Sequence, residues 1–359
     1  MITAHIRART RLLLVVLGAA CVVSTARGGE TLPARLTDQQ FWRLITDMSE
    51  LNGTFRSDNL LSNEVWLQAV IPELTRVAKP DRVYMGVGPE QNFTYIAALK
   101  PKMAFIVDVR RGNLDLHLMY KALFELSADR GDFVSRLFSK PRPDGLDGNS
   151  RANDIFAAVM KMDSSEAAYK SNLKAILDHL ATKHGLTLTA EDLTGIEYIY
   201  HAFFEYGPAI QYSSTGSFGG RYQPTYADLM GSTDASGQAR SYLATEDRFA
   251  FLKDLESRNM LVPVVGNFAG PSAIRKVGGY LKEKSATVSA FYLSNVEQYL
   301  RQDGLWHTFC GNVAALPLDE TSTFIRSVRG PSGQQFGFGL NSELAPMTEV
   351  KECGHPERH

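Results

Sequence analysis

The chain has 359 residues, of which 44% are hydrophobic and 21% are charged. This composition is typical of a globular protein, and the length allows one large domain or two smaller ones. The formal net charge of -1 argues against nucleic acid as a partner, because nucleic-acid-binding proteins carry a large positive surface.

The first 26 residues have the pattern of a secretory signal peptide. Three arginines and no acid precede an apolar run of 12 residues, 12–23, and small residues follow up to Ala26. The run is too short to span a bilayer. We therefore expect cleavage near Ala26 and export to the periplasm or the outside of the cell. Two alternatives are a lipoprotein acylated at Cys21 and an uncleaved N-terminal anchor.

The chain that follows begins with alternating helices and strands. Periodic hydrophobic residues predict helices at 37 to about 52, 64–78, 91–99 and 114–126, and apolar runs predict strands at 83–87 and 103–109. Pro72 lies inside the second helix and predicts a kink or two shorter pieces. The second strand, MAFIVDV, is almost continuously apolar, which is typical of a strand buried on both faces of a parallel sheet.

The middle of the chain predicts a helical insertion at about 129–206. Its helices are expected near 133–138, 153–162, 165–184 and 190–206. A stretch rich in Gly, Ser and Tyr follows at about 212–238 and predicts a long loop. Because loops of this length are usually functional or disordered, and aromatic residues argue against disorder, we interpret it as a lid over a pocket.

The last part of the chain returns to α/β alternation. Helices are predicted at 245–258, 271–284 and 295–300, and strands at 261–265, 286–293 and 324–328, the last as an edge strand. Residues 349–359 are expected to form a loose tail, and Cys310 and Cys353 could form one disulfide. Residues 27–348 therefore predict one α/β domain, a Rossmann-like, mostly parallel sheet flanked by helices, with a helical insertion and no transmembrane span.

The turn between the first two predicted strands has the features of a cofactor site. Gly86 and Gly88 follow the first strand directly, and Asp108 closes the second strand 22 residues after Gly86. The third glycine of the dinucleotide fingerprint is replaced by the sequence PEQN. Glu90 disfavours a pyrophosphate there, whereas an S-adenosyl ligand has no phosphate and carries an ammonium group. The stretch 83–126 resembles the first two strands of the Rossmann-like S-adenosylmethionine-dependent methyltransferases.

This resemblance implies that the two glycines line the methionine and ribose part of S-adenosylmethionine, that Asp108 holds the ribose, and that residues 109–113 flank the adenine. The predicted cofactor-binding residues are Gly86, Gly88, Glu90, Asn92, Asp108, Arg110 and Asn113. The chain also resembles a group of uncharacterised exported bacterial proteins with the same core. The alternative is an exported ligand-binding or interaction protein on a degenerate Rossmann-like fold. Export favours this alternative, because S-adenosylmethionine is made in the cytosol.

Further candidates come from the other predicted strand ends, since ligands of open α/β sheets bind beyond the carboxyl ends of strands. The candidate substrate-binding residues are Arg111, Asn267, Asn295 and Glu297, all of which could also serve only as solvated or helix-capping groups. His117 could act as a base or pack as an interface histidine. The catalytic residues and the methyl acceptor stay open, and a hydrolase using acids of the 212–238 stretch is a third interpretation without specific residues.

A metal site is not predicted. Glu197, His201 and Glu205 would share one helix face, but exposed faces of this composition are common without a metal. The sequence also contains no HExxH or Cys-x-x-Cys motif.

Overall fold

The computed structural model of the chain describes residues 30–214, 223–329 and 340–353, so the predicted signal peptide and Cys21 lie outside the described residues. The centre of the fold is a six-stranded sheet with the order β3-β2-β1-β4-β5-β6. The first five strands in this order are parallel, and only β6 is antiparallel. The strands are β1 (Val83–Gly86), β2 (Met103–Asp108), β3 (Leu261–Val265), β4 (Val288–Ser294), β5 (Thr323–Arg329) and β6 (Leu340–Pro346). The predicted Rossmann-like α/β fold is therefore confirmed.

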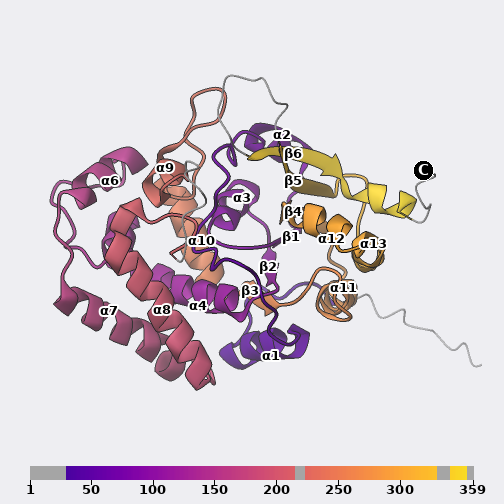
Figure 1. Cartoon of the computed structure of the whole chain (residues 1–359), viewed down its shortest axis with the longest axis horizontal. Helices are drawn as coiled ribbons and strands as arrows, with labels where there is room; N and C mark the ends of the chain where they lie inside the picture. Colours follow the sequence, from indigo (N-terminus) through magenta and orange to yellow (C-terminus); the bar gives the residue numbers. More distant parts are fainter. Residues whose placement is uncertain (1–29, 215–222, 330–339, 354–359) are drawn as a thin grey trace, which may run out of the picture.

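Helices cover both faces of the sheet, as Figure 1 shows. One face is covered by α3 (Gln91–Leu99), α4 (Arg111–Leu126) and α10 (Glu246–Ser257), and the other by α1 (Asp38–Met48), α11 (Ala273–Glu283), α12 (Val296–Gln302) and α13 (Trp306–Ala314). Every residue of β1, β2 and β3 is buried, in agreement with the continuous hydrophobicity of the second predicted strand. None of the helices among the described residues is both long and apolar enough to cross a membrane.

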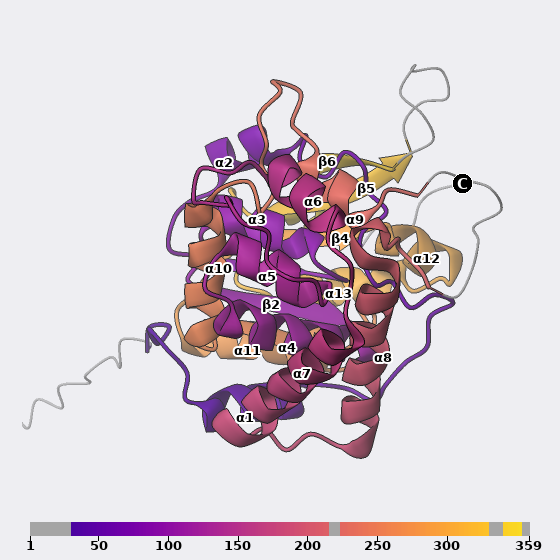
Figure 2. The same cartoon turned by 90° about the vertical axis from the view of Figure 1, so that its left-hand side faces the viewer.

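The helical insertion forms an outer layer on the α4 face. It contains α5 (Arg130–Leu137), α6 (Ala152–Met160), α7 (Glu166–Asp178), the π-helical turn η1 (His179–Lys183) and α8 (Ala190–Tyr206). Figure 2 shows α7 and α8 in front of α4. Residues 212–238, which were predicted as one loop, include a short helix, α9 (Tyr226–Gly231). The predicted second helix is helical only in α2 (Ile71–Val77), where Pro72 occupies the first turn.

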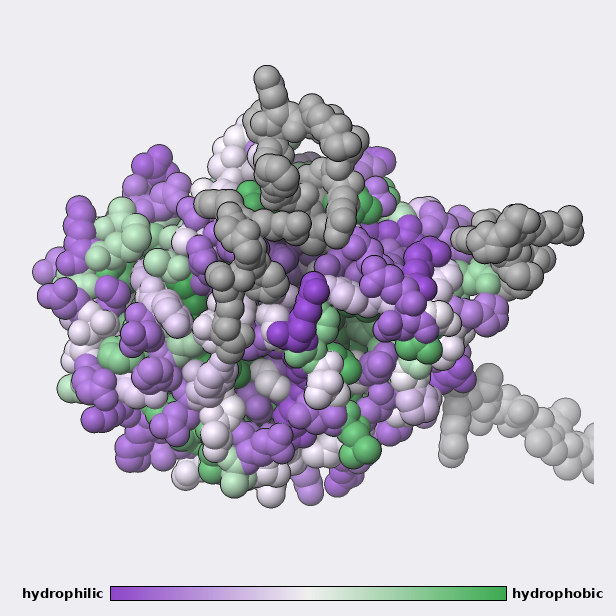
Figure 3. All heavy atoms as spheres, viewed as in Figure 1, coloured by the Kyte–Doolittle hydropathy of each residue, from purple (hydrophilic) through white to green (hydrophobic). Residues whose placement is uncertain are grey.

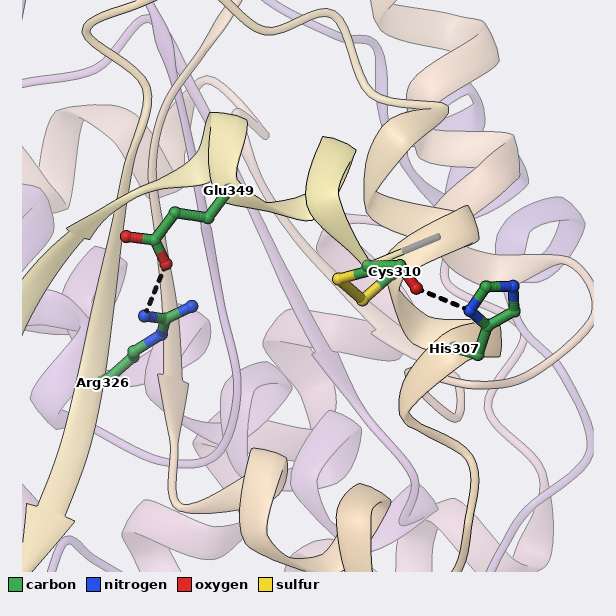
Figure 4. The surroundings of a disulfide bond; sticks show 5 residues. His307, Cys310, Arg326 and Glu349 are labelled. Carbon is green, nitrogen blue, oxygen red and sulfur yellow. Dashed lines mark hydrogen bonds and ion pairs between the residues drawn. A yellow bond between two sulfur atoms is a disulfide. The ribbon is translucent and has the colours of Figure 1, made fainter. Parts of the chain in front are cut away.

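Two predictions for the C-terminal part are wrong. β5 is not an edge strand, because β6 pairs with it along its whole length. The segment after residue 348 is not entirely loose, because the 3-10 helix η3 (Met347–Glu352) leads to Cys353, which is disulfide-bonded to Cys310 of α13. Figure 4 shows this bond together with His307, whose Nδ1 lies 2.8 Å from the Cys353 carbonyl oxygen. The sequence left open whether these two cysteines pair, and the structure shows that they do. Residues 354–359 lie outside the described part.

Candidate functional site at the carboxyl edge of the sheet

The carboxyl edge of the sheet is covered by the chain's own residues 49–64, which we call the edge segment. The backbone N–H groups of Glu50 and Gly53 donate to carbonyl groups at the ends of β3 and β2, each at 2.8 Å. Farther along, Ser62 contacts the turn after β1 and Glu64 contacts the end of β4. The edge segment therefore crosses the strand ends in the order of the sheet. It covers the point between β1 and β4 where the strand order reverses, which is the usual ligand position in this fold.

The turn after β1 is held by the side chain of Asn92. Its Nδ2 donates to the carbonyl groups of Val87, Gly88 and Pro89 at 2.7–3.2 Å, and its Oδ1 accepts a hydrogen bond from a buried tyrosine. A Cβ atom at Gly86 would overlap this amide, so Gly86 is needed to admit Asn92. Gly88 has a φ of +76°, and the place of its missing Cβ is open within 4 Å. Of the two glycines, Gly88 is therefore the one beside which an added atom would meet open space.

Glu90 does not present a negative charge at the start of α3. Its side chain is fully buried, and both carboxyl oxygens lie 3.2 Å from the backbone nitrogen of Ser62 in the edge segment. Burial raises the pKa of Glu90 to about 8, although the hydrogen bond from Ser62 acts in the opposite direction. The group is therefore mostly protonated at neutral pH. The sequence argument, in which Glu90 repels a pyrophosphate by its charge, does not fit this geometry.

Asp108 is at the end of β2 and is engaged by Arg110. The backbone nitrogen of Arg110 lies 2.9 Å from Asp108 Oδ1, and its Nε and Nη2 lie 3.2 and 3.3 Å from the two carboxylate oxygens. The remaining Nη1 donates to the backbone carbonyl of Asp58 in the edge segment. A bidentate arginine is a strong partner for a carboxylate. A ribose that binds Asp108 would share the carboxylate with the Arg110 guanidinium.

The first turns of α4 carry buried polar atoms without partners. Asn113 Oδ1, Asp115 Oδ1 and His117 Nδ1 have no hydrogen-bond partner among the described residues. His117 Nε2 lies 2.9 Å from the carbonyl oxygen of Gly88, so Nε2 carries the proton and Nδ1 is an acceptor. Burial lowers the pKa of His117 to about 4, and this ring is neutral at pH 7. Asn113 and His117 are four residues apart and share a helix face.

Arg111, a candidate substrate residue, faces the helical insertion. Its Nε and Nη2 bind the carboxylate of Asp192 on α8 at 2.6 and 3.0 Å. Asp115 lies close to the same pair, and burial together with Asp192 raises the pKa of Asp115 to about 8. Arg111 therefore joins α4 to the insertion and is not directed at Gly88.

Of the three candidates after β3 and β4, Asn267 and Glu297 have local partners. Asn267 is exposed, and its Oδ1 accepts from the backbone nitrogen of Ala269 at 2.9 Å. Beside it, Glu50 of the edge segment accepts 2.8 Å hydrogen bonds from two backbone N–H groups at the start of α11, where an anionic ligand would otherwise find donors. Asn295 precedes α12 without a side-chain capping bond. Glu297 is paired with Arg326 at 3.0 Å.

Sequence reasoning missed Glu64, which it placed at the start of an amphipathic helix. Its Oε1 accepts hydrogen bonds from the hydroxyl groups of Tyr292 and Ser294 at the end of β4, and Gln91 Nε2 donates to the same tyrosine. Burial raises the pKa of Glu64. The sequence contains no periodic signal for this contact, because it joins residues 228 positions apart.

The potential metal ligands on α8 are not brought together in a buried place. Glu197, His201 and Glu205 are all exposed, and the His201 ring packs edge-on against Tyr169 at 5.6 Å. This arrangement fits a solvated helix face.

The comparison with known protein families gives one match. A family model described as a domain of unknown function, DUF7790, matches residues 60–185 and 213–350, which include all six strands. No curated protein matches the chain.

Proposed function

Because the chain belongs to DUF7790, a family whose description assigns no function, we propose its function from the geometry of its strand ends. We propose that it is a methyltransferase-like protein that binds an S-adenosyl ligand, such as S-adenosylmethionine, between Gly88 and Asp108.

The observation that carries this proposal is the pair of unpartnered acceptors on α4. Asn113 Oδ1 and His117 Nδ1 are buried, share a helix face and have no partner among the described residues, and His117 contacts Gly88, where space is open. Buried acceptors of this kind need donors from a ligand or from water. A nucleoside offers donors in its ribose hydroxyls and its exocyclic amine. A phosphate at neutral pH offers almost only acceptors, so the pair favours an adenosyl group over a pyrophosphate.

A second candidate function is an exported binding or interaction protein that has lost the chemistry. It is favoured by the edge segment, whose residues contact Asp108 through Arg110 and hold Glu90 through Ser62. On the face shown in Figure 3, the coloured surface is mainly hydrophilic, with hydrophobic side chains in small groups. A partner on this face would therefore bind by polar contacts more than by a broad apolar patch.

The first experiment is a calorimetric titration of the purified protein with S-adenosylhomocysteine. Micromolar binding that is lost in Asp108→Ala and in His117→Ala supports the S-adenosyl site. Asp154→Asn, which removes an exposed carboxylate of α6, is the matched control and should bind as the wild type does. If the folded wild-type protein releases no heat, this result contradicts the S-adenosyl site. The exported binding or interaction protein is then the remaining candidate function.

A further inference from the structure

Three side chains with metal-binding atoms meet between α4 and the π-helical turn η1, away from the carboxyl edge. Their nitrogen and oxygen atoms all lie within 4.8 Å of one another, and the residues are Glu125, His179 and His184. The Nε2 atoms of His179 and His184 lie 2.9 and 2.8 Å from the same oxygen, Glu125 Oε2. The side chains are only 4–7% exposed. Two imidazoles and one carboxylate therefore converge on one buried point.

The π-helical turn explains why both rings face that point. The backbone nitrogen of His184 donates to the carbonyl oxygen of His179 at 3.1 Å, which is the i to i+5 bond of a π-helix. On a regular α-helix, residues five apart point in different directions, whereas the wider π turn brings them into line. Turns of this kind occur frequently at functional sites. The spacing matches no common metal motif, so the sequence alone gave no signal.

A second carboxylate orients the ring of His184 through its other nitrogen. Its Nδ1 lies 2.6 Å from Oδ1 of Asp38, the first residue of α1, and Asn259 Nδ2 donates to the same oxygen at 2.8 Å. A carboxylate that accepts from one ring nitrogen holds the histidine in the tautomer whose other nitrogen is free to bind a metal. Asp38 therefore acts through His184, whose ring it holds in position.

The hydrogen-bond geometry of the cluster also suits an ion. Both Nε2 atoms face the same carboxylate oxygen, Glu125 Oε2, and the other ring nitrogen of His184 faces Asp38. A divalent cation would bind both Nε2 atoms and the same oxygen. Lys121 Nζ holds the other oxygen, Oε1, at 2.7 Å, which leaves Oε2 as the single carboxylate ligand. Lys183, 3.4 Å from Oε2, has a 60% exposed side chain and is free to turn toward solvent.

We propose that Glu125, His179 and His184 bind a divalent transition-metal ion of the zinc class, and that Asp38 positions His184. Two imidazole nitrogens and one carboxylate oxygen are a donor set that suits Zn²⁺, and three protein ligands leave a fourth position for water or an added ligand. His179 also lines an open surface depression together with Asp178 and Lys183. The ion would join α1, α4 and η1, and so fix the insertion to the core.

The test is a zinc titration of the chelator-stripped full chain in competition with a chromophoric chelator. The expected result is one Zn²⁺ per chain with a dissociation constant of about 1 µM or tighter. His179→Ala should weaken binding by about 100-fold or more, and Asp38→Asn by about 10- to 100-fold. Lys183→Ala should tighten binding by about 2- to 5-fold, because it removes a cation beside the ligand atoms. His201→Ala, an exposed histidine of α8, is the matched control and should bind as the wild type does.

Equal affinities of the wild type and His179→Ala for Zn²⁺ would overturn the proposal. If His179→Ala does not fold, Lys183→Ala decides, since tighter binding supports the site and unchanged or weaker binding contradicts it. Co²⁺ gives an independent readout on the wild type. Visible ligand-field absorption of a four- or five-coordinate ion supports the site. The weak spectrum of the hydrated ion contradicts it.

Discussion

Replacing Glu90 by Gln should change how the stability of the protein depends on pH. Glu90 is fully buried, and burial raises its pKa from 4.5 to about 8. In the unfolded chain the group ionises near its usual pKa. Between these two values the folded state therefore holds one proton that the unfolded state has released. This contribution to stability is complete below pH 4.5 and is lost as the pH rises toward 8.

The size of the effect follows from this proton. A difference of one bound proton changes the free energy of unfolding by about 1.4 kcal/mol per pH unit, so the wild type loses at most about 5 kcal/mol between pH 4.5 and 8 through this group. Glutamine keeps an oxygen that accepts from the Ser62 backbone nitrogen but has no proton to release. The stability of the variant relative to the wild type should therefore grow by about 1.4 kcal/mol per pH unit from pH 5 to 7.5.

The assay is urea denaturation of both proteins at pH 5, 6, 7 and 7.5, with the free energy of unfolding compared at each pH. Glu73→Gln is the matched control, because Glu73 is exposed and Arg76 lowers its pKa. Its difference from the wild type should stay constant over this pH range. A constant difference for Glu90→Gln as well would refute the reasoning, since it would mean that the folded protein holds Glu90 ionised.

Two further predictions concern packing and the disulfide. Gly278→Ala places a Cβ atom 2.8 Å from the backbone oxygen of Ala315 and should lower the free energy of unfolding by about 1–3 kcal/mol, while Gly279→Ala on the same helix has open space and should raise it by up to about 1 kcal/mol. Urea titrations with equal results for the two variants would contradict this geometry. Reduction of the bond between Cys310 and Cys353, which are 43 residues apart, should remove up to about 4 kcal/mol and lower the melting temperature. Identical melting curves with and without reductant would count against that contribution.

The elements with strong periodic patterns could be predicted from the sequence. The start of α1 is one example, since Thr37 and Gln40 have the spacing of a capping box in the sequence and both of its hydrogen bonds are present. The helix predicted at 91–99 agrees with α3, and the strands predicted at 83–87 and 103–109 agree with β1 and β2 to within one residue. These signals are local, because each element carries its own cap, breaker or apolar run.

The elements that the sequence missed depend on partners far along the chain. β5 was predicted as an edge strand because its hydrophobicity alternates, but β6 pairs with it after a separate stretch of chain. α13 was not predicted, although it carries Cys310 and packs against the core through Phe309. The tail was predicted as loose, since nothing in its own residues shows that Cys353 is held by a disulfide.

At the candidate site, the sequence determined which residues lie at the strand ends, because the apolar runs that form β1 and β2 stop just before Gly88 and at Asp108. The tertiary structure decided what those residues contact. It placed Arg110 on Asp108, turned Glu90 inward to Ser62, and laid the edge segment 49–64 across the strand ends. Burial and hydrogen-bond partners are set by segments that meet only when the chain is folded. A local sequence pattern therefore fixed the positions of these groups, and only the fold fixed their charges and their partners.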